Sequence, residues 1–134
     1  MKKRFLTTKY TKHTKRKLTP EVVVQKQLDA YNAKDIDALM ATYAVDAEQF
    51  EHPAKLLASG AAQIRERFVA RFKEPDLYAH LVRRIVAGNV VIDHELVTRN
   101  FPEGKGKVEL VAIYEVQNQK IAKAWFIIGA KTLD

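Results

Sequence analysis

Apolar residues near the start of the chain recur at spacings of three and four, the period of an amphipathic helix. Val24, Leu28 and Tyr31 fall on one face of a predicted helix at residues 20–33. Pro20 stands at its first position, where a missing N–H costs nothing. The pattern therefore predicts an N-terminal helix with one buried face.

The same period returns twice more before the pattern changes. Residues 36–45 form a predicted second helix with Asp35 as its cap, and residues 60–72 a third. A short strand is expected at residues 48–52, ended by a proline. Residues 55–59 are too few to assign. The first half of the chain thus predicts a helical hairpin, a strand and a further helix.

The second half consists of long extended runs rich in β-branched and aromatic residues. Glycine, asparagine or proline separates them, as expected for hairpins in an antiparallel meander. The predicted strands are residues 78–87, 90–99, 107–117 and 120–130. Because the helices precede the strands and do not alternate with them, the predicted fold class is α+β.

Alternate side chains of a strand point to opposite faces, and in the last two predicted strands both sets are apolar. One set runs from Val108 to Val116 and includes Tyr114 and Phe126. The other set includes Ile113 and Trp125. One face is expected to pack on the helices. The other is too apolar to face water and predicts a homodimer through the outer sheet face.

The chain has 134 residues and no cysteine, which excludes disulfides, thiolate metal sites and a cysteine nucleophile. This length corresponds to one domain, expected at residues 19–134. No apolar run approaches the roughly 18 residues of a membrane span. We therefore expect a cytoplasmic protein that does not bind membranes.

The net charge of +7 is concentrated at the N-terminus. Residues 1–18 contain eight basic and no acidic residues, whereas residues 19–134 contain 15 basic and 16 acidic ones. The basic segment has two interpretations, an arm for phosphate groups or a disordered, solvated tail. We favour the tail, because nothing else in the chain suggests a nucleic-acid-binding fold.

Several short motifs resemble a known superfamily. They are Asn-Ala-Lys-Asp at 32–35, Tyr-Ala-Val-Asp-Ala at 43–47, His52-Pro53, Ile-Arg-Glu at 64–66 after Gly60, Tyr-Glu-Val at 114–116 and Lys-Ile-Ala-Lys-Ala-Trp at 120–125. Residues 20–130 are similar to the domain shared by nuclear transport factor 2, the ketosteroid isomerases and the SnoaL-like polyketide cyclases. The resemblance implies a cone-shaped, cystatin-like α+β barrel, in which a curved sheet wraps the helices and encloses an apolar pocket, usually in a dimer.

The resemblance to ketosteroid isomerases also implies positions for the site. Their general-base aspartate precedes the proline that ends the first strand, and that position here is His52. Their two oxyanion-binding positions correspond to Gln27 and Ala112. With no acid at Ala112, the steroid-isomerase site is changed. His52 remains a credible base, since imidazole titrates near neutrality, although a structural histidine is the alternative.

A second histidine, His94, shares its strand parity with Ile92 and Leu96. It is therefore expected to face the pocket with His52, whereas Asp93 and Glu95 are expected to face outward. We predict His52 and His94 as catalytic residues. His80 is a possible third inward histidine, yet no spacing matches a compact metal-binding motif, and no metal site is expected. The predicted ligand-binding residues are Gln27, Tyr31, Phe68, Phe72, Tyr114 and Phe126.

Two functions remain open from the sequence. The first is cofactor-independent proton transfer on an apolar carbonyl compound, of the isomerase, dehydratase or cyclase type, with His52 as the base. The second is a non-catalytic domain that binds a small apolar molecule in the same pocket.

Overall fold

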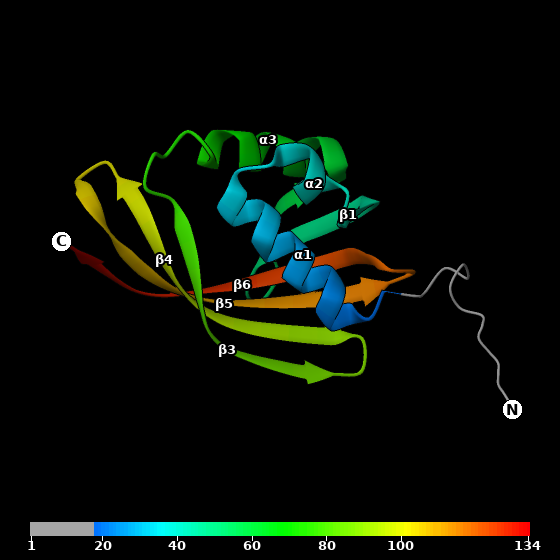
Figure 1. Ribbon diagram of the computed structural model, residues 1–134. Helices are drawn as coiled ribbons and strands as arrows, with labels where there is room; N and C mark the ends of the chain where they lie inside the picture. The colour runs from blue at the N-terminus through cyan, green and yellow to red at the C-terminus, as the bar shows by residue number, and fades with distance from the viewer. Residues whose placement is uncertain (1–17) are drawn as a thin grey trace, which may run out of the picture.

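The computed structural model describes residues 18–134, and the predicted basic tail at residues 1–18 lies outside them except for Leu18. The first part of the chain contains three helices and two shorter strands, and four longer strands follow (Figure 1). The elements are α1 (Pro20–Ala33), α2 (Ile36–Met40), β1 (Tyr43–Glu51), β2 (Lys55–Ser59), α3 (Ala61–Arg71), β3 (Tyr78–Ala87), β4 (Val90–Phe101), β5 (Gly104–Gln117) and β6 (Lys120–Leu133).

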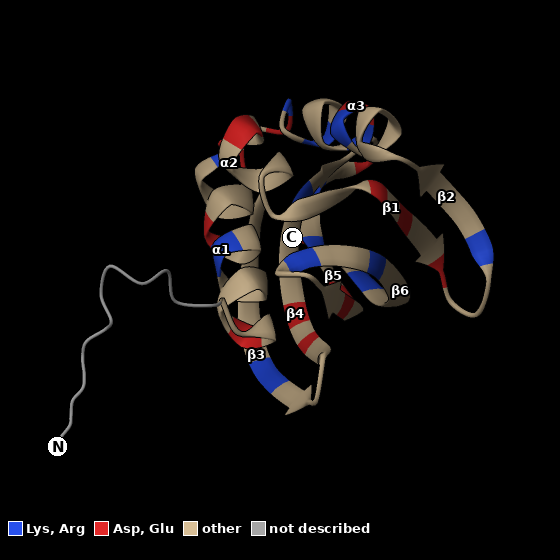
Figure 2. Cartoon of the chain, turned by 90° about the vertical axis from the view of Figure 1, so that its right-hand side faces the viewer, with Lys and Arg blue, Asp and Glu red and all other residues tan. Residues whose placement is uncertain are grey.

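The six strands form one curved sheet in the order β2-β1-β6-β5-β4-β3. All neighbours are antiparallel except β1 and β6, which are parallel. The helices lie on one face, and the sheet curls toward them (Figures 1 and 2). The predicted α+β class with a mixed, curved sheet is confirmed, and the sheet is open, with β2 and β3 at its edges.

The first helix has the predicted ends and buried face. The Thr19 hydroxyl accepts a hydrogen bond from the backbone N–H of Val22, and Lys34 ends the helix in the left-handed region at φ 55°. Val24, Leu28 and their neighbours pack against the sheet. α1 is thus the element around which the concave core is built.

The second helix is shorter than predicted. It ends at Met40, and the chain enters β1 at Tyr43, where the sequence pattern favours helix as far as residue 45. Pairing decides this: Tyr43 lies beside Ile121 of β6, and both side chains are buried. Residues 55–59, which the pattern leaves unassigned, form β2 because β1 offers them a partner.

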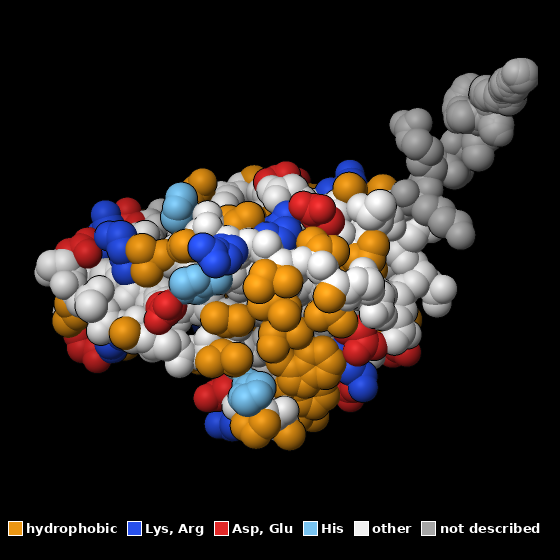
Figure 3. All heavy atoms as spheres, turned by 90° about the horizontal axis from the view of Figure 1, so that it is seen from below, with side chains coloured by type: hydrophobic (Ala, Val, Ile, Leu, Met, Phe, Trp, Pro, Cys, Tyr) orange, Lys and Arg blue, Asp and Glu red, His pale blue; other side chains and the backbone are white. Residues whose placement is uncertain are grey.

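The outer face of the sheet carries a row of apolar side chains that crosses all six strands. Cross-strand neighbours in this row are Ile85 with Ile92, Ile92 with Ile113, Ile113 with Trp125, Trp125 with Phe50 and Phe50 with Leu56. The Trp125 and Phe50 rings stack with their centroids 5.8 Å apart. Figure 3 shows this face as a continuous hydrophobic area.

In residues 18–134, no helix is long and apolar enough to cross a membrane. The expected cytoplasmic location stays a prediction.

A buried ion pair joins the two strands at one edge of the concave face. Arg84 of β3 donates from Nε and Nη2 to both carboxylate oxygens of Asp93 on β4, at 2.7 and 2.9 Å. Asp93 is completely buried and the Arg84 side chain nearly so. Such a pair need not add net stability, but losing one partner leaves a buried charge without compensation.

We therefore expect Asp93→Asn to lower the free energy of unfolding by about 3 kcal/mol, measured by urea denaturation at pH 7. The matched control is Asp37→Asn, which removes an exposed ion pair to Arg65 and should cost less than about 1 kcal/mol. Equal losses in the two variants would contradict the structural role of the buried pair.

Candidate functional site

A cavity of about 250 Å³ lies between α1, α3 and the concave face of the sheet. Aliphatic and aromatic side chains from these elements form most of its wall. They are Leu28, Leu57, Phe68, Ala79, Val97, Phe101, Val108, Leu110, Phe126 and Ile128. An apolar wall with a few polar groups is typical of a small-molecule pocket, and the volume favours a small ligand.

Five of the six predicted ligand-binding residues line this cavity. They are Gln27, Tyr31, Phe68, Tyr114 and Phe126. The sixth, Phe72, lies behind them and packs edge-on against Tyr31, with ring centroids 5.7 Å apart. Whether these residues bind a ligand stays a prediction, but their shared location follows from the helical and strand periodicity used to choose them.

The two predicted catalytic histidines lie outside the cavity, so the expectation that both face inward is wrong. His52 is exposed just beyond β1, on the outward parity of Phe50, and its backbone N–H donates to the carbonyl of Phe126. His94 lies on the outer face, where its Nε2 is 2.7 Å from Glu109 Oε2. His80 is exposed as well.

The parity error arises on β4. Val91, Asp93, Glu95 and Val97 face inward, because they pair with Tyr114, Ala112, Leu110 and Val108 of β5, whose own side chains face the helices. Asp93 and Glu95 were expected to face outward, and both are buried. The more apolar set, with Ile92 and Leu96, faces outward instead as part of the apolar outer face.

In the described part of the chain, Glu95 is the only acidic residue that lines the cavity. It is 4% exposed, and among residues 18–134 its carboxyl makes no ion pair and no hydrogen bond to another side chain. Burial, reinforced by the charge of Asp93, raises the pKa of Glu95 to about 8, although Arg84 opposes the shift. At pH 7 this carboxyl is mostly neutral and able to change its protonation state near the physiological range.

Hydrogen-bond donors lie on the same wall. The Tyr114 hydroxyl donates to Gln27 Oε1 at 3.4 Å, and Gln49 Nε2 donates to the Tyr43 hydroxyl at the same distance. Burial raises the pKa of both tyrosines, so they stay protonated. The Tyr114 bond occupies the amide oxygen of Gln27, and Tyr43 also hydrogen-bonds with this side chain. The NH₂ group of Gln27 has two hydrogens, so one N–H remains for a ligand oxygen.

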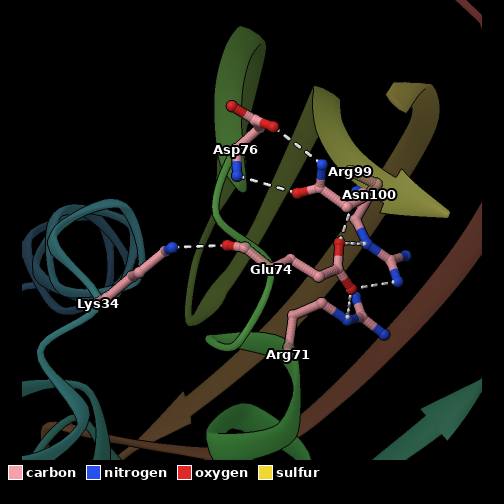
Figure 4. A network of polar contacts seen from close by, with 6 residues as sticks. All are labelled: Lys34, Arg71, Glu74, Asp76, Arg99 and Asn100. Atoms are coloured by element: carbon pink, nitrogen blue, oxygen red, sulfur yellow. Dashed lines mark hydrogen bonds and ion pairs between the residues drawn. The ribbon is translucent and has the colours of Figure 1, made fainter. Parts of the chain in front are cut away.

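Basic residues also line the cavity. Arg67 and Arg71 come from α3 and Arg99 from β4. Figure 4 shows how the chain holds two of them: Glu74 accepts two hydrogen bonds from Arg99 at 2.8 Å and lies 3.5 Å from Arg71. Burial works against the charge of Glu74, but hydrogen bonds from Arg99 and the Asn100 backbone still lower its pKa.

The polar lining residues that the sequence analysis missed are Gln49, Arg67, Arg71, Glu95, Arg99 and Lys131. A signal existed for two of them, since Arg67 and Arg71 are one turn apart beside the apolar stripe of the third helix. None existed for the others, because strand pairing decides which face they occupy. Within residues 18–134, no three histidine, aspartate or glutamate side chains are grouped to hold a metal ion.

The raised pKa of Glu95 makes a prediction for stability. The folded protein holds its proton up to about pH 8, whereas the unfolded chain releases it near pH 4.5, so stability is lost as pH rises between these values. Urea denaturation from pH 5 to 9 should show Glu95→Gln becoming more stable than wild type by about 3–5 kcal/mol, with a plateau above pH 8. The surface control Glu66→Gln, at an exposed position of α3, should show no such trend. If the difference in the free energy of unfolding between Glu95→Gln and wild type does not change with pH, the raised pKa of Glu95 is contradicted.

Comparison with known proteins agrees with this architecture. None of the curated proteins matches the chain. Among solved structures, an uncharacterised cystatin-fold protein from Novosphingobium aromaticivorans has a TM-score of 0.76 at 23% identity, over 81% of this chain and 97% of that one. An NTF2-like protein of unknown function from Cytophaga hutchinsonii has a TM-score of 0.70 at 13% identity, over 86% and 94%.

A third solved structure carries a ligand. It is a hypothetical protein from Catenulispora acidiphila with a ketosteroid isomerase-like fold, in complex with trimethylamine, and it has a TM-score of 0.68 at 16% identity, over 81% of this chain and 85% of that one. At such identities these likenesses show the fold alone. The model of the SnoaL-like domain family matches residues 24–124, which is most of the chain. This protein therefore belongs to the SnoaL-like domain family.

Proposed function

We propose that this protein is an enzyme that transfers a proton on a small apolar carbonyl compound without a cofactor, with Glu95 as the base. The observation that carries the proposal is the buried carboxyl of Glu95, unpaired among residues 18–134, on the wall of an apolar cavity. We assign the base to Glu95 and not to His52, because His52 is exposed outside the cavity.

The surroundings of Glu95 support a base and not an acid. Proton abstraction next to a carbonyl needs one acceptor for the proton and donors for the oxygen that becomes negative. The cavity wall offers a donor through the amide of Gln27, which Tyr114 orients, while Glu95 is the only carboxyl that residues 18–134 place on it. A carboxylate with a pKa near 8 is a stronger base than an ordinary glutamate and is still partly ionised at pH 7.

In this mechanism the apolar wall holds the body of the ligand and excludes water. Gln27 donates a hydrogen bond from its amide NH₂ group to the carbonyl oxygen, and Tyr114, whose hydroxyl donates to Gln27 Oε1, orients that amide. Glu95 takes the proton from the neighbouring carbon and returns it to the same or another carbon, so no external acid or cofactor is needed. The reaction class is therefore isomerisation or enolisation, and a β-hydroxy ketone would lose water by the same first step.

The test is exchange of the α-protons of 2-tetralone in D₂O, followed by NMR. We expect the exchange rate per enzyme to rise with pH through about 8 and to fall at least 100-fold in Glu95→Gln. Glu109→Gln and His52→Ala, both outside the cavity, should leave the rate unchanged.

A wild-type rate in Glu95→Gln would refute Glu95 as the base. The alternative function is a non-catalytic domain that binds an apolar ligand. It is supported if wild-type protein exchanges no protons but 2-tetralone raises its melting temperature.

We also propose that the protein forms a homodimer through the outer sheet face. The apolar row across the six strands has no cover among residues 18–134, and an exposed contiguous apolar surface is typical of an interface. Ile113 lies at the middle of the row, between Ile92 and Trp125.

Ile113→Lys should therefore convert a dimer into a monomer in light scattering coupled to gel filtration. The control Val69→Lys adds the same charge to an exposed apolar position on α3 and should leave the mass unchanged. A monomeric wild-type protein at 50 μM would contradict the homodimer.

A further inference from the structure

The cavity has more positive charge on its wall than nearby carboxylates balance. Four basic residues line it: Arg67, Arg71, Arg99 and Lys131. Two carboxylates lie next to them, since Glu74 pairs with Arg71 and Arg99, and Glu103 pairs with Lys131. Glu95, buried and mostly neutral at pH 7, adds little negative charge. Among residues 18–134, four positive and two negative charges leave this part of the wall with a net charge of about +2.

Arg67 is the clearest case. Within residues 18–134 its guanidinium makes no ion pair, and its described hydrogen bond goes to a neutral group, the Oε1 of Gln49. The side chain is half-buried on α3, and burial together with the charge of Arg71 lowers its pKa. A partly desolvated cation without a counter-charge is costly, so a negative group bound beside it would be strongly stabilised.

The three arginines line one side of the cavity. Arg67 and Arg71 are one helical turn apart on α3, so their side chains project from the same face. Arg71 and Arg99 meet at the shared carboxylate of Glu74, which fixes both side chains (Figure 4). Figure 2 shows basic positions along α3. The three arginines thus form one cationic group on the cavity wall, and Phe68 and Phe126 belong to the apolar part of that wall.

We propose that the ligand of this pocket is a carboxylate: an apolar carbonyl compound whose carboxylate group binds Arg67 and Arg71 while its body lies against the apolar wall. The guanidinium group presents paired N–H donors that match the two oxygens of a carboxylate. Arg67 supplies the charge that lacks a partner, and Glu74 holds Arg71 in place without neutralising both arginines. This inference rests on the proposed function, because it names the substrate class of the same pocket.

The experiment uses two probes that differ only in charge, 4-oxo-4-phenylbutanoate and 4-oxo-4-phenylbutanamide. Both have an enolisable ketone on an apolar ring. Isothermal titration calorimetry at pH 7 should show the acid binding at least tenfold more tightly than the amide. Arg67→Gln should bring this ratio close to one without weakening the amide.

Two further variants test whether the preference depends on the unpaired charge of Arg67. Gln49→Glu places a carboxylate next to Arg67 within the protein, so it should remove the preference for the acid while Arg67 remains. Arg65→Gln removes a charge from the exposed side of α3, where Arg65 pairs with Asp37, and should leave the ratio unchanged. Circular dichroism and melting temperature verify that each variant is folded.

The outcomes separate this inference from the proposed function. If the amide binds as tightly as the acid and both exchange α-protons, the carboxylate inference is overturned and the enzyme proposal stands. If the acid binds selectively but Glu95→Gln still exchanges the α-protons of the acid at the wild-type rate, the carboxylate inference stands and the role of Glu95 as the base is refuted. If neither probe binds, the carboxylate inference is overturned, and the enzyme proposal stands or falls by the exchange of 2-tetralone.

Discussion

Alternate side chains of a strand face opposite ways, so the register between β4 and β5 decides what the concave face of this protein contains. Asp93 lies opposite Ala112, and Glu95 lies opposite Leu110, which turns two acidic side chains toward the helices. A shift of one residue would put Ile92 and His94 there instead. The pocket carboxyl, the buried pair to Arg84 and the apolar outer row all depend on this one register.

The register also explains why charge is distributed so unevenly across the molecule. Asp93 is tolerated in the core because Arg84 donates two hydrogen bonds to it. Glu95 has no such partner in residues 18–134, and burial leaves it mostly neutral at pH 7. Around the arginines of the cavity wall, positive charge is in excess. Glu74 pairs with two arginines, and Arg67 hydrogen-bonds to the neutral amide of Gln49. A pocket with these groups is suited to a ligand that has an apolar body, a polar carbonyl and a negative end.

Most of the fold was predictable because it depends on local periodicity. The cap at Thr19, the apolar face of α1 and the short hairpin between β5 and β6 are all consequences of residues close together in the chain. The errors occur where distant pairing overrides local preference. β1 begins at Tyr43 because β6 is its neighbour, and β2 exists because β1 is its partner. Among the site residues, periodicity found Gln27, Tyr31 and Tyr114, but not Glu95.

The sequence by itself determined the α+β class, the order of the elements, the uneven charge along the chain and the two apolar faces of the last strands. These features follow from spacing and composition, which need no knowledge of distant contacts. Only the tertiary structure decided that His52 and His94 face away from the cavity and that Glu95 and Arg67 face it. The physical reason is that both sets of side chains on β4 contain apolar residues, so hydrophobicity did not select the inner one. Pairing with β5 selected it, and with it the chemistry of the pocket.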